Sequence, residues 1–374
     1  MLKRCLTAAA VSLLMMGAVA AEPIKLANVI ELSGGGAAVG QNWRDGAELA
    51  VANINAAGGI LGEPVELTDY DTQSDPVTSR GQAQRAIDDG AFAILGPIYS
   101  GSAVVNMVVA QAAGVPQFTG AEAPNVTAMG NPYIFRTSYG AQKAMPKIAA
   151  YLTSLGIDKV AIVWVNSEYG KGGRDPFIAE MEKAGIAVSV EAVTEVNQVD
   201  FASDVARIKA SDAKALFVYL TEEESARLLK ELRRQGIDMP IIGEAGTFGP
   251  NVVKLAGDAA EGVFAHVPLT PNADIPTIVA FRDAFVAKYN YTPDHNAMKG
   301  YIAAYIVKHV VEMVGSADRQ KFADTLHGLT ITAKDEPGVL LDVSFDATGE
   351  VSRESFMTTV KDGANVVTAI LPAN

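Results

Sequence analysis

Cysteine is almost absent from this sequence. The 374 residues contain a single one, Cys5, close to the N-terminus. A disulfide within one copy is therefore excluded, and so is a metal site built on cysteine thiolates. Histidine is scarce as well: the four histidines stand in no HExxH or HxH arrangement, and the carboxylates are dispersed. The residues therefore give no support to a bound metal ion.

Positive charge is also in short supply. Lys and Arg number 30 against 43 Asp and Glu, which gives a formal net charge of −13 at pH 7. An excess of negative charge repels phosphate backbones and anionic membrane surfaces. We therefore expect no nucleic acid among the partners of this chain.

Long apolar runs are missing beyond the first 21 residues, because no later stretch reaches the roughly 20 residues that a membrane helix needs. Residues 1–21 have the parts of an export signal: the charges of Lys3 and Arg4, an apolar stretch at 6–17, and small residues at 18–21. Cleavage after residue 20 or 21 would also remove the only thiol. The predicted location is the periplasm, where nucleotide cofactors are scarce.

What the sequence does contain is an alternation of apolar runs with helical periodicity, the pattern of an α/β protein with parallel sheets. Its length suggests two domains. The first half predicts strands at 24–32, 65–71, 92–95 and 116–119, and helices from 42, from 76 and at 102–113. After a helix at 141–155 the order restarts, with strands at 159–165, 187–193, 215–220 and 240–243, and helices at 171–184, 200–210 and 223–235. Helices at 275–289 and 296–314 and short strands at 343–345, 355–361 and 366–371 complete the chain. We expect two doubly wound parallel-sheet lobes with a cleft between them.

In open parallel sheets, ligands bind beyond the carboxyl ends of the strands. Ser100-Gly101-Ser102 has this position, between a strand and a helix, where hydroxyl and N–H groups can converge on a carboxylate. Gly120-Ala121 follows the next strand and offers a further backbone donor. The alternative role for Ser100 is ordinary helix capping. Two such loops on one sheet edge favour an anionic group on the ligand.

Other chemistries are less well supported. Gly34-Gly35-Gly36, with Asp69 and Asp71 after the next strand, resembles part of a dinucleotide site, but the third small residue of that fingerprint is replaced by Val39. A G-x-S-x-G hydrolase motif is missing from the sequence. The acidic run 222–224 suits a helix N-terminus, and contact with a ligand is its alternative reading.

Several short segments form a combined pattern behind the export signal. They are Ser33-Gly34, Gly40, 45–50, 53–60, Gly62, Tyr70-Asp71-Thr72, Asp75-Pro76, Gly96-Pro97, Gly114-Val115-Pro116, Tyr169-Gly170, 345–349 and Asp362-Gly363. Together these segments resemble the type I periplasmic solute-binding proteins of ABC importers, in the branch that includes the leucine/isoleucine/valine-binding protein. The resemblance covers nearly the whole mature chain.

This resemblance implies the type I periplasmic binding protein fold, with two lobes joined by a hinge of three crossings. The N-terminal lobe would comprise residues 22–140 plus 270–340, and the C-terminal lobe 141–269 plus 341–374. It further implies that Ser100 and Ala121 hold a ligand carboxylate and that Tyr169 closes over it. Some positions depart from the family pattern: Ala123 replaces a threonine, and Thr221 a tyrosine. The family's acid that meets an ammonium group aligns with Ala245, beside Glu244, and Val39 stands where the family has an aromatic residue at the rim of the site.

We therefore expect the substrate-binding component of an ABC importer, a monomer without cofactor or enzymatic activity, which delivers its solute to a permease in the inner membrane. The first ligand class is a hydrophobic or branched-chain amino acid; an aromatic carboxylate or a short amide is the second. A ligand-sensing module is the alternative role. The expected ligand-binding residues are Ser100, Ala121, Tyr169, Glu244, Tyr99, Glu222, Ser102 and Thr221. In this scheme Glu244 or Glu222 meets an ammonium or hydroxyl group, and Tyr99, with Phe118 and Trp43, supplies aromatic walls.

Overall fold

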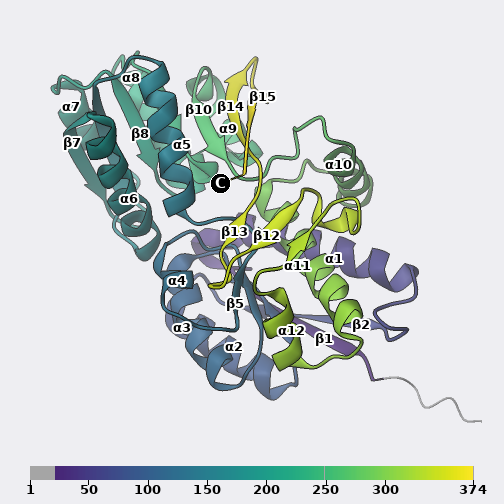
Figure 1. Ribbon diagram of the computed structural model, residues 1–374. Coiled ribbons are helices and arrows are strands. Elements are labelled where there is room, and N and C mark those ends of the chain that lie inside the picture. Colours follow the sequence, from purple (N-terminus) through teal and green to yellow (C-terminus); the bar gives the residue numbers. More distant parts are fainter. Residues whose placement is uncertain (1–21, 248, 374) are drawn as a thin grey trace, which may run out of the picture.

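Two large sheets organise the chain, as the computed structural model in Figure 1 shows for residues 22–247 and 249–373. The predicted export signal lies outside the described residues. The first sheet has the order β2-β1-β3-β4-β5, and all neighbouring strands run parallel. Its strands are β1 (Ile24–Ile30), β2 (Val65–Asp71), β3 (Ala93–Leu95), β4 (Gln117–Thr119) and β5 (Ile134–Arg136).

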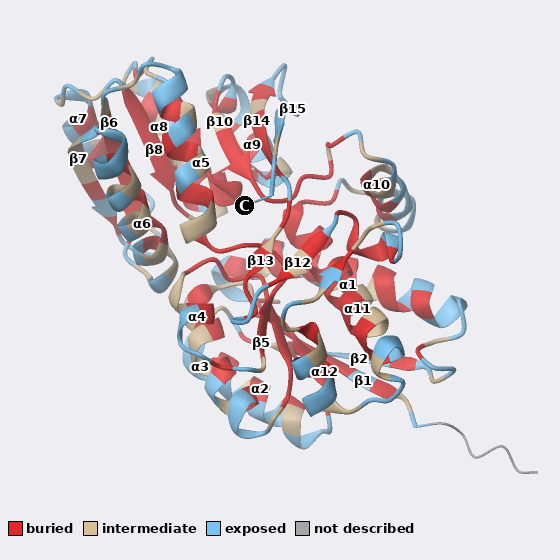
Figure 2. Cartoon of the chain, viewed as in Figure 1, coloured by how far each residue is buried: buried red, intermediate tan, exposed pale blue. Residues whose placement is uncertain are grey.

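Helices cover both faces of this sheet because the side chains of each strand alternate between them. From β1, Ala27 and Val29 pack on one face against α2 (Pro76–Asp88) and α3 (Ser100–Ala112). Leu26 and Ile30 pack on the other, in the core that includes α1 (Ala37–Ala56), α11 (His295–Val314) and α12 (Arg319–Leu326). Buried residues accordingly concentrate along the strands in Figure 2. The short helix α4 (Asn125–Ala128) precedes β5.

The second sheet has the order β15-β14-β10-β9-β8-β6-β7. Its central strands are parallel, and an antiparallel pair closes one edge. The strands are β6 (Lys159–Val165), β7 (Ala187–Thr194), β8 (Ala215–Tyr219), β9 (Ile241–Gly243), β10 (Phe264–Val267), β14 (Ser355–Lys361) and β15 (Ala364–Leu371). Helix α5 (Ala141–Ser154) precedes these strands, and the helices between them are α6 (Glu168–Ala184), α7 (Ala202–Lys209), α8 (Glu222–Arg234) and α9 (Pro250–Ala256).

The chain passes between the two sheets three times. It leaves the first sheet after β5, leaves the second after β10 for α10 (Pro276–Tyr289) and α11, and returns with β14. Before that return, β11 (Thr330–Ile331), β12 (Val343–Phe345) and β13 (Val351–Ser352) form a small separate sheet. Because these strands pair with neither large sheet, pairing alone does not assign them to a lobe. The predicted lobe boundaries stay predictions.

Helices α1 and α11 approach each other closely, through one glycine on each. A Cβ on Gly46 would lie 2.0 Å from the carbonyl oxygen of Ala297, and one on Gly300 would lie 2.2 Å from that of Trp43. No side chain fits at those distances, so the two backbones touch there. This contact fixes the first turn of α11, which carries several polar side chains, relative to the first sheet.

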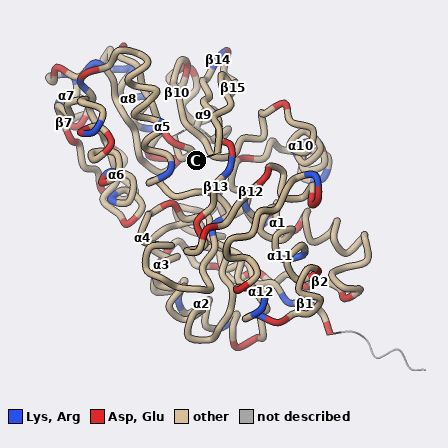
Figure 3. The backbone as a smooth tube through the Cα atoms, in the orientation of Figure 1, with Lys and Arg blue, Asp and Glu red and all other residues tan. Residues whose placement is uncertain are grey.

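The α/β class with two parallel-rich sheets is confirmed, and most of the predicted elements are present. The expected helix start at Asp75-Pro76 is confirmed in detail, since the Asp75 carboxylate accepts the N–H of Thr78 at 2.7 Å. Helices α1, α3 and α6 begin earlier than expected, and β5, β10, α9 and α12 were not predicted. Charges of both signs are interspersed along the chain in Figure 3. Within the described ranges, no helix combines the length and apolarity that crossing a bilayer requires.

Candidate functional site

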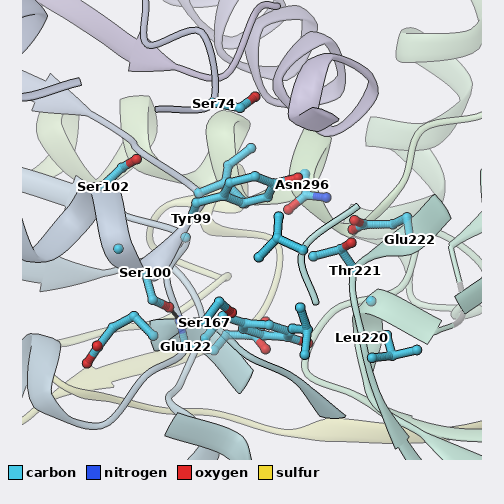
Figure 4. Close-up of a pocket in the computed structure, with 18 of the residues that line it drawn as sticks. Ser74, Tyr99, Ser100, Ser102, Glu122, Ser167, Leu220, Thr221, Glu222 and Asn296 are labelled. Atoms are coloured by element: carbon cyan, nitrogen blue, oxygen red, sulfur yellow. Dashed lines mark hydrogen bonds between the residues drawn. The ribbon is translucent and has the colours of Figure 1, made fainter. Parts of the chain in front are cut away.

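A cavity of about 370 Å³ lies where loops from both large sheets meet (Figure 4). That volume falls within the range of small-molecule sites. The loops after β2, β3 and β4 and the first turns of α11 contribute Ser74, Pro76, Ile98, Tyr99, Ser100, Gly101, Ser102, Gly120, Glu122, His295, Asn296 and Lys299. The ends of β6, β7, β8 and β9 and the loops that follow them contribute Val165, Ser167, Glu168, Tyr169, Val196, Leu220, Thr221, Glu222 and Gly246. Most of these residues directly follow β3, β4, β6, β8 or β9, as the strand-end rule predicts.

The N-terminus of α3 opens into this cavity. Its N-cap residue is Tyr99, whose side chain makes no capping hydrogen bond within the described structure, and Ser100 is the first helical residue. The Ser100 hydroxyl oxygen instead accepts the N–H groups of Glu122 at 3.3 Å and Ala123 at 3.2 Å. Both lone pairs of the hydroxyl are thereby used, so its hydrogen is left to donate into the cavity. The N–H groups of the first helical turn, which have no acceptor within the helix itself, add further donors. We call the Ser100 hydroxyl and these N–H groups the anion receptor, because such an arrangement suits a negative charge.

Two buried charged side chains hold the loops of this receptor in place. The Glu31 carboxylate accepts the N–H groups of Ile98 and Tyr99, each at 3.1 Å, and fixes the entry into α3. Burial raises the pKa of Glu31 to about 7. On the neighbouring loop, the Arg136 guanidinium donates to the carbonyl oxygens of Ala121 and Ala123 and forms a 2.7 Å ion pair with Glu350. The loop geometry is therefore fixed by hydrogen bonds and an ion pair within the chain rather than by a ligand.

Beside this receptor lies an ion pair on the cavity wall. The Lys299 ammonium donates to Glu122 Oε1 at 3.1 Å and to the Gly120 carbonyl oxygen at 3.2 Å, and the residue is only 1 % exposed. Burial raises the pKa of Glu122, while the charge of Lys299 opposes that shift. The two opposite charges compensate each other, so this wall is strongly polar without a net charge.

The opposite wall comes from the segments that follow β6 and β8. The Tyr169 ring stacks on Tyr219, with 4.3 Å between ring centroids. The Thr221 hydroxyl donates to Glu224 at 2.7 Å, so it is committed to the start of α8. Glu222 faces the cavity, as Figure 4 shows, and burial raises its pKa to about 8. In the protein without a solute, its carboxyl group is therefore mostly protonated at neutral pH.

Six of the eight predicted ligand-binding residues line this cavity: Tyr99, Ser100, Ser102, Tyr169, Thr221 and Glu222. The other two, Ala121 and Glu244, do not line the cavity in the described part of the chain. The N–H of Ala121 donates to the hydroxyl of Thr119 at 3.1 Å. Glu244 is 2 % exposed, and its carboxylate contacts His266 Nδ1 at 2.5 Å and accepts the N–H of Ala245 at 2.9 Å. Of the two acids proposed for an ammonium group, only Glu222 is available in the cavity.

The aromatic walls differ from the prediction. Trp43 and Phe118 are fully buried in the core, and of the three predicted aromatic side chains only that of Tyr99 lines the cavity. Sequence reasoning missed His295, Asn296, Lys299 and Glu122, all of which line it. The available signal was a lysine within the otherwise apolar stretch 297–307. Asp71, one of the two acids in the dinucleotide-like pattern, has a structural role, because its carboxylate accepts the N–H groups of Leu32 and Ser33 and the Ser33 hydroxyl.

Comparison with known proteins identifies the family of this chain. Residues 23–365 match the family described as periplasmic binding protein. The chain belongs to that family. This periplasmic binding protein is 28 % identical over 357 residues to the leucine-, isoleucine-, valine-, threonine- and alanine-binding protein of Pseudomonas aeruginosa, covering 95 % of this chain and 94 % of that one. The family comprises solute-binding proteins of ABC transporters, which are not enzymes.

Solved structures share the fold of this periplasmic binding protein. The branched-chain amino acid transporter substrate-binding protein of Streptococcus pneumoniae in complex with isoleucine superposes with a TM-score of 0.83 at 26 % identity, covering 94 % of this chain and 99 % of that one. A solute-binding protein of an ABC transporter from R. palustris in complex with benzoate gives a TM-score of 0.86 at 21 % identity, covering 94 % and 98 %. The predicted fold is thus confirmed.

Proposed function

We propose that this protein captures a small solute through its carboxylate, with a hydrophobic amino acid as the first ligand class. The observation that carries the proposal is the start of α3, where the Ser100 hydroxyl has both lone pairs occupied and can only donate. A carboxylate matches such a donor, together with the free N–H groups of the first turn. The related protein from P. aeruginosa, named for aliphatic amino acids and threonine, supports the same class.

The rest of the cavity suits an amino acid with an apolar body. Ile98, Val165 and Leu220 contribute apolar surface, and the rings of Tyr99 and Tyr169 face the same space. Glu222, on the wall opposite α3, would meet the ammonium group. Closure of two lobes about a hinge would then bury the solute. The protein would act as a monomer after its export to the periplasm and would deliver the solute to a permease in the inner membrane.

An aromatic carboxylate is the second candidate. The observation that favours it is the pair of tyrosine rings contributed by opposite walls, since aromatic rings attract each other in offset or edge-to-face geometry. The benzoate complex of the structural neighbour agrees with this alternative. Such a solute has no ammonium group and would leave Glu222 protonated.

The replacement of Ser100 by alanine tests the carboxylate site. We expect the variant to lose about 1–3 kcal/mol of binding free energy, because the solute carboxylate loses a hydrogen-bond donor in a buried site. Isothermal titration calorimetry with the best solute of a thermal-shift screen measures the loss. Ser189→Ala, a substitution on β7 outside the cavity, is the matched control. Equal affinities of the Ser100→Ala variant and the parent protein would contradict the placement.

The pH dependence of binding separates the two ligand classes. In the free protein the pKa of Glu222 is about 8, through burial first, with Asp294 and Glu122 raising it and Lys299 lowering it. An ammonium group binds the ionised carboxylate and lowers that pKa, so affinity for L-leucine should rise by up to about tenfold per unit as pH increases from 6 to 8. Benzoate requires no ionised Glu222, and its affinity should stay level there and fall above pH 8. The Glu222→Gln variant should show neither slope, and a leucine affinity independent of pH in the parent protein would count against a role for Glu222.

A thermal-shift screen over amino acids, aromatic acids and short amides tests the ligand class as a whole. A solute that binds the folded state raises the midpoint of thermal unfolding by mass action. A shift with aliphatic amino acids supports the first class, and a shift with benzoates the second. A response confined to solutes without a carboxylate would overturn the proposal. The alternative role as a sensing module predicts the same binding but no stimulation of a reconstituted permease.

A further inference from the structure

Three buried polar groups that line the cavity have bonding capacity that the described residues leave unused. Asn296 is fully buried, and its Oδ1 accepts no hydrogen bond from the described residues. Ser102 is 1 % exposed, and within the described chain its hydroxyl is likewise without a partner. Lys299 uses two of its three ammonium hydrogens, on Gly120 and Glu122. All three side chains line the cavity, and Asn296 and Ser102 are among the residues labelled in Figure 4.

The orientation of the Asn296 amide is fixed by its neighbour. Asp294 accepts the Asn296 main-chain N–H at 2.7 Å and the side-chain Nδ2 at 3.3 Å. A carboxylate accepts from the amide nitrogen and not from the amide oxygen, so a flipped amide would place two acceptors against each other. Oδ1 is therefore the free end, and it is an acceptor only.

Helix α11 thus offers an acceptor, Asn296, and a donor, Lys299, to the cavity. Asn296 and Lys299 are three residues apart on the helix, which places them on one face. The charge of Lys299 is already compensated by Glu122 at 3.1 Å, so a second anionic group on the solute would find no uncompensated cation there. A neutral group that donates to Asn296 and accepts from Lys299 satisfies both, and the Ser102 hydroxyl on α3 is a further group that lacks a partner among the described residues.

We infer that the solute carries, on its otherwise apolar body, a neutral group that both donates and accepts a hydrogen bond, namely a hydroxyl or an amide. This inference rests on the proposed function and sharpens its ligand class. A purely apolar body would seal the Asn296 oxygen and the Ser102 hydroxyl from water without replacing their hydrogen bonds. Sites built for a polar group discriminate strongly against the analogue that lacks it, because their own buried groups are then unpaired.

Matched pairs of probes test this inference, each pair differing chiefly in the polar group. The pairs are L-valine and L-threonine, L-leucine and L-asparagine, and benzoate and 4-hydroxybenzoate. Calorimetry should show, in the pair or pairs that bind, that the polar member binds about tenfold or more tightly than the apolar one. A preference for L-threonine or 4-hydroxybenzoate identifies a hydroxyl as the neutral group, and a preference for L-asparagine identifies an amide.

The Asn296→Leu variant connects the preference to Asn296. Leucine is similar in size but has no acceptor, so the variant should lose most of the preference for the polar member. Asn251→Leu, an exposed position on α9 outside the cavity, should retain it. An apolar member that binds as tightly as its polar partner in the parent protein overturns the inference and leaves the proposed function standing. So does a preference that Asn296→Leu does not change. If all six probes fail to bind, the proposed ligand classes are wrong, and the inference falls with them.

Discussion

Replacement of Arg136 by methionine is expected to lower the free energy of unfolding by about 3–5 kcal/mol, the range for breaking a buried ion pair from one side. The Arg136 side chain is 0 % exposed and that of Glu350 only 4 %. Without the guanidinium, the Glu350 carboxylate stays buried without its cation, and the carbonyl oxygens of Ala121 and Ala123 lose their donor. Methionine keeps much of the volume, so the loss reports the polar contacts. Urea denaturation followed by circular dichroism measures it.

The Arg85→Met variant is the control for Arg136. Arg85 forms an ion pair with Asp89 on the surface of the molecule, with side chains that are 71 % and 56 % exposed. Exposed pairs of this kind contribute about 0–1 kcal/mol, so the control should unfold close to the parent protein. A loss for Arg136→Met no larger than that of the control would show that the buried pair does not stabilise the fold.

Replacement of Trp43 by alanine is expected to cost about 3–5 kcal/mol of stability as well, because it leaves a large void in a close-packed core. Trp43 is fully buried. A Cβ on Gly120 would lie 2.9 Å from its ring, and a Cβ on Gly300 would lie 3.2 Å from it. The indole therefore supports two parts of the cavity wall, the loop after β4 and the first turns of α11. We expect weaker binding of the solute in the folded variant too.

Two further variants serve as controls for the expected loss of stability in Trp43→Ala. Trp43→Phe keeps most of the ring volume and should lose markedly less stability than Trp43→Ala. Val77→Ala removes apolar atoms at a position that is 81 % exposed and should change the unfolding free energy by less than about 0.5 kcal/mol. If Trp43→Ala and Val77→Ala unfold at the same urea concentration, the ring does not support the core in the way its burial suggests.

The fold was readable from the sequence because its signals are local. Apolar runs bounded by Gly and Pro located most strands of both sheets, and Asp75-Pro76 marked a helix start that the structure confirms. The elements that were missed are short or depend on distant partners. β10 has four residues and pairs with both β9 and β14, so nothing in its own sequence separates it from a loop.

The site was readable only in part, because side-chain direction depends on tertiary contacts. The strand-end rule located Ser100 and Glu222 correctly on the cavity. Glu244 also follows a strand, yet His266 from the neighbouring strand β10 takes its carboxylate into the interior. Lys299 was missed for the opposite reason: a lysine in an apolar helix normally suggests a solvated face, and its partner Glu122 is distant in sequence.

The donor arrangement at Ser100 is complete before any solute arrives, since backbone N–H groups of its own chain orient the hydroxyl. Rigid, pre-aimed recognition of this kind costs little conformational entropy at the moment of capture. If the solute is the proposed carboxylate, this donor arrangement can stay constant in evolution while substitutions in the first turns of α8 and α11 change the recognition of the rest of the solute. Related solute-binding proteins would then change their specificity without any change at the start of α3.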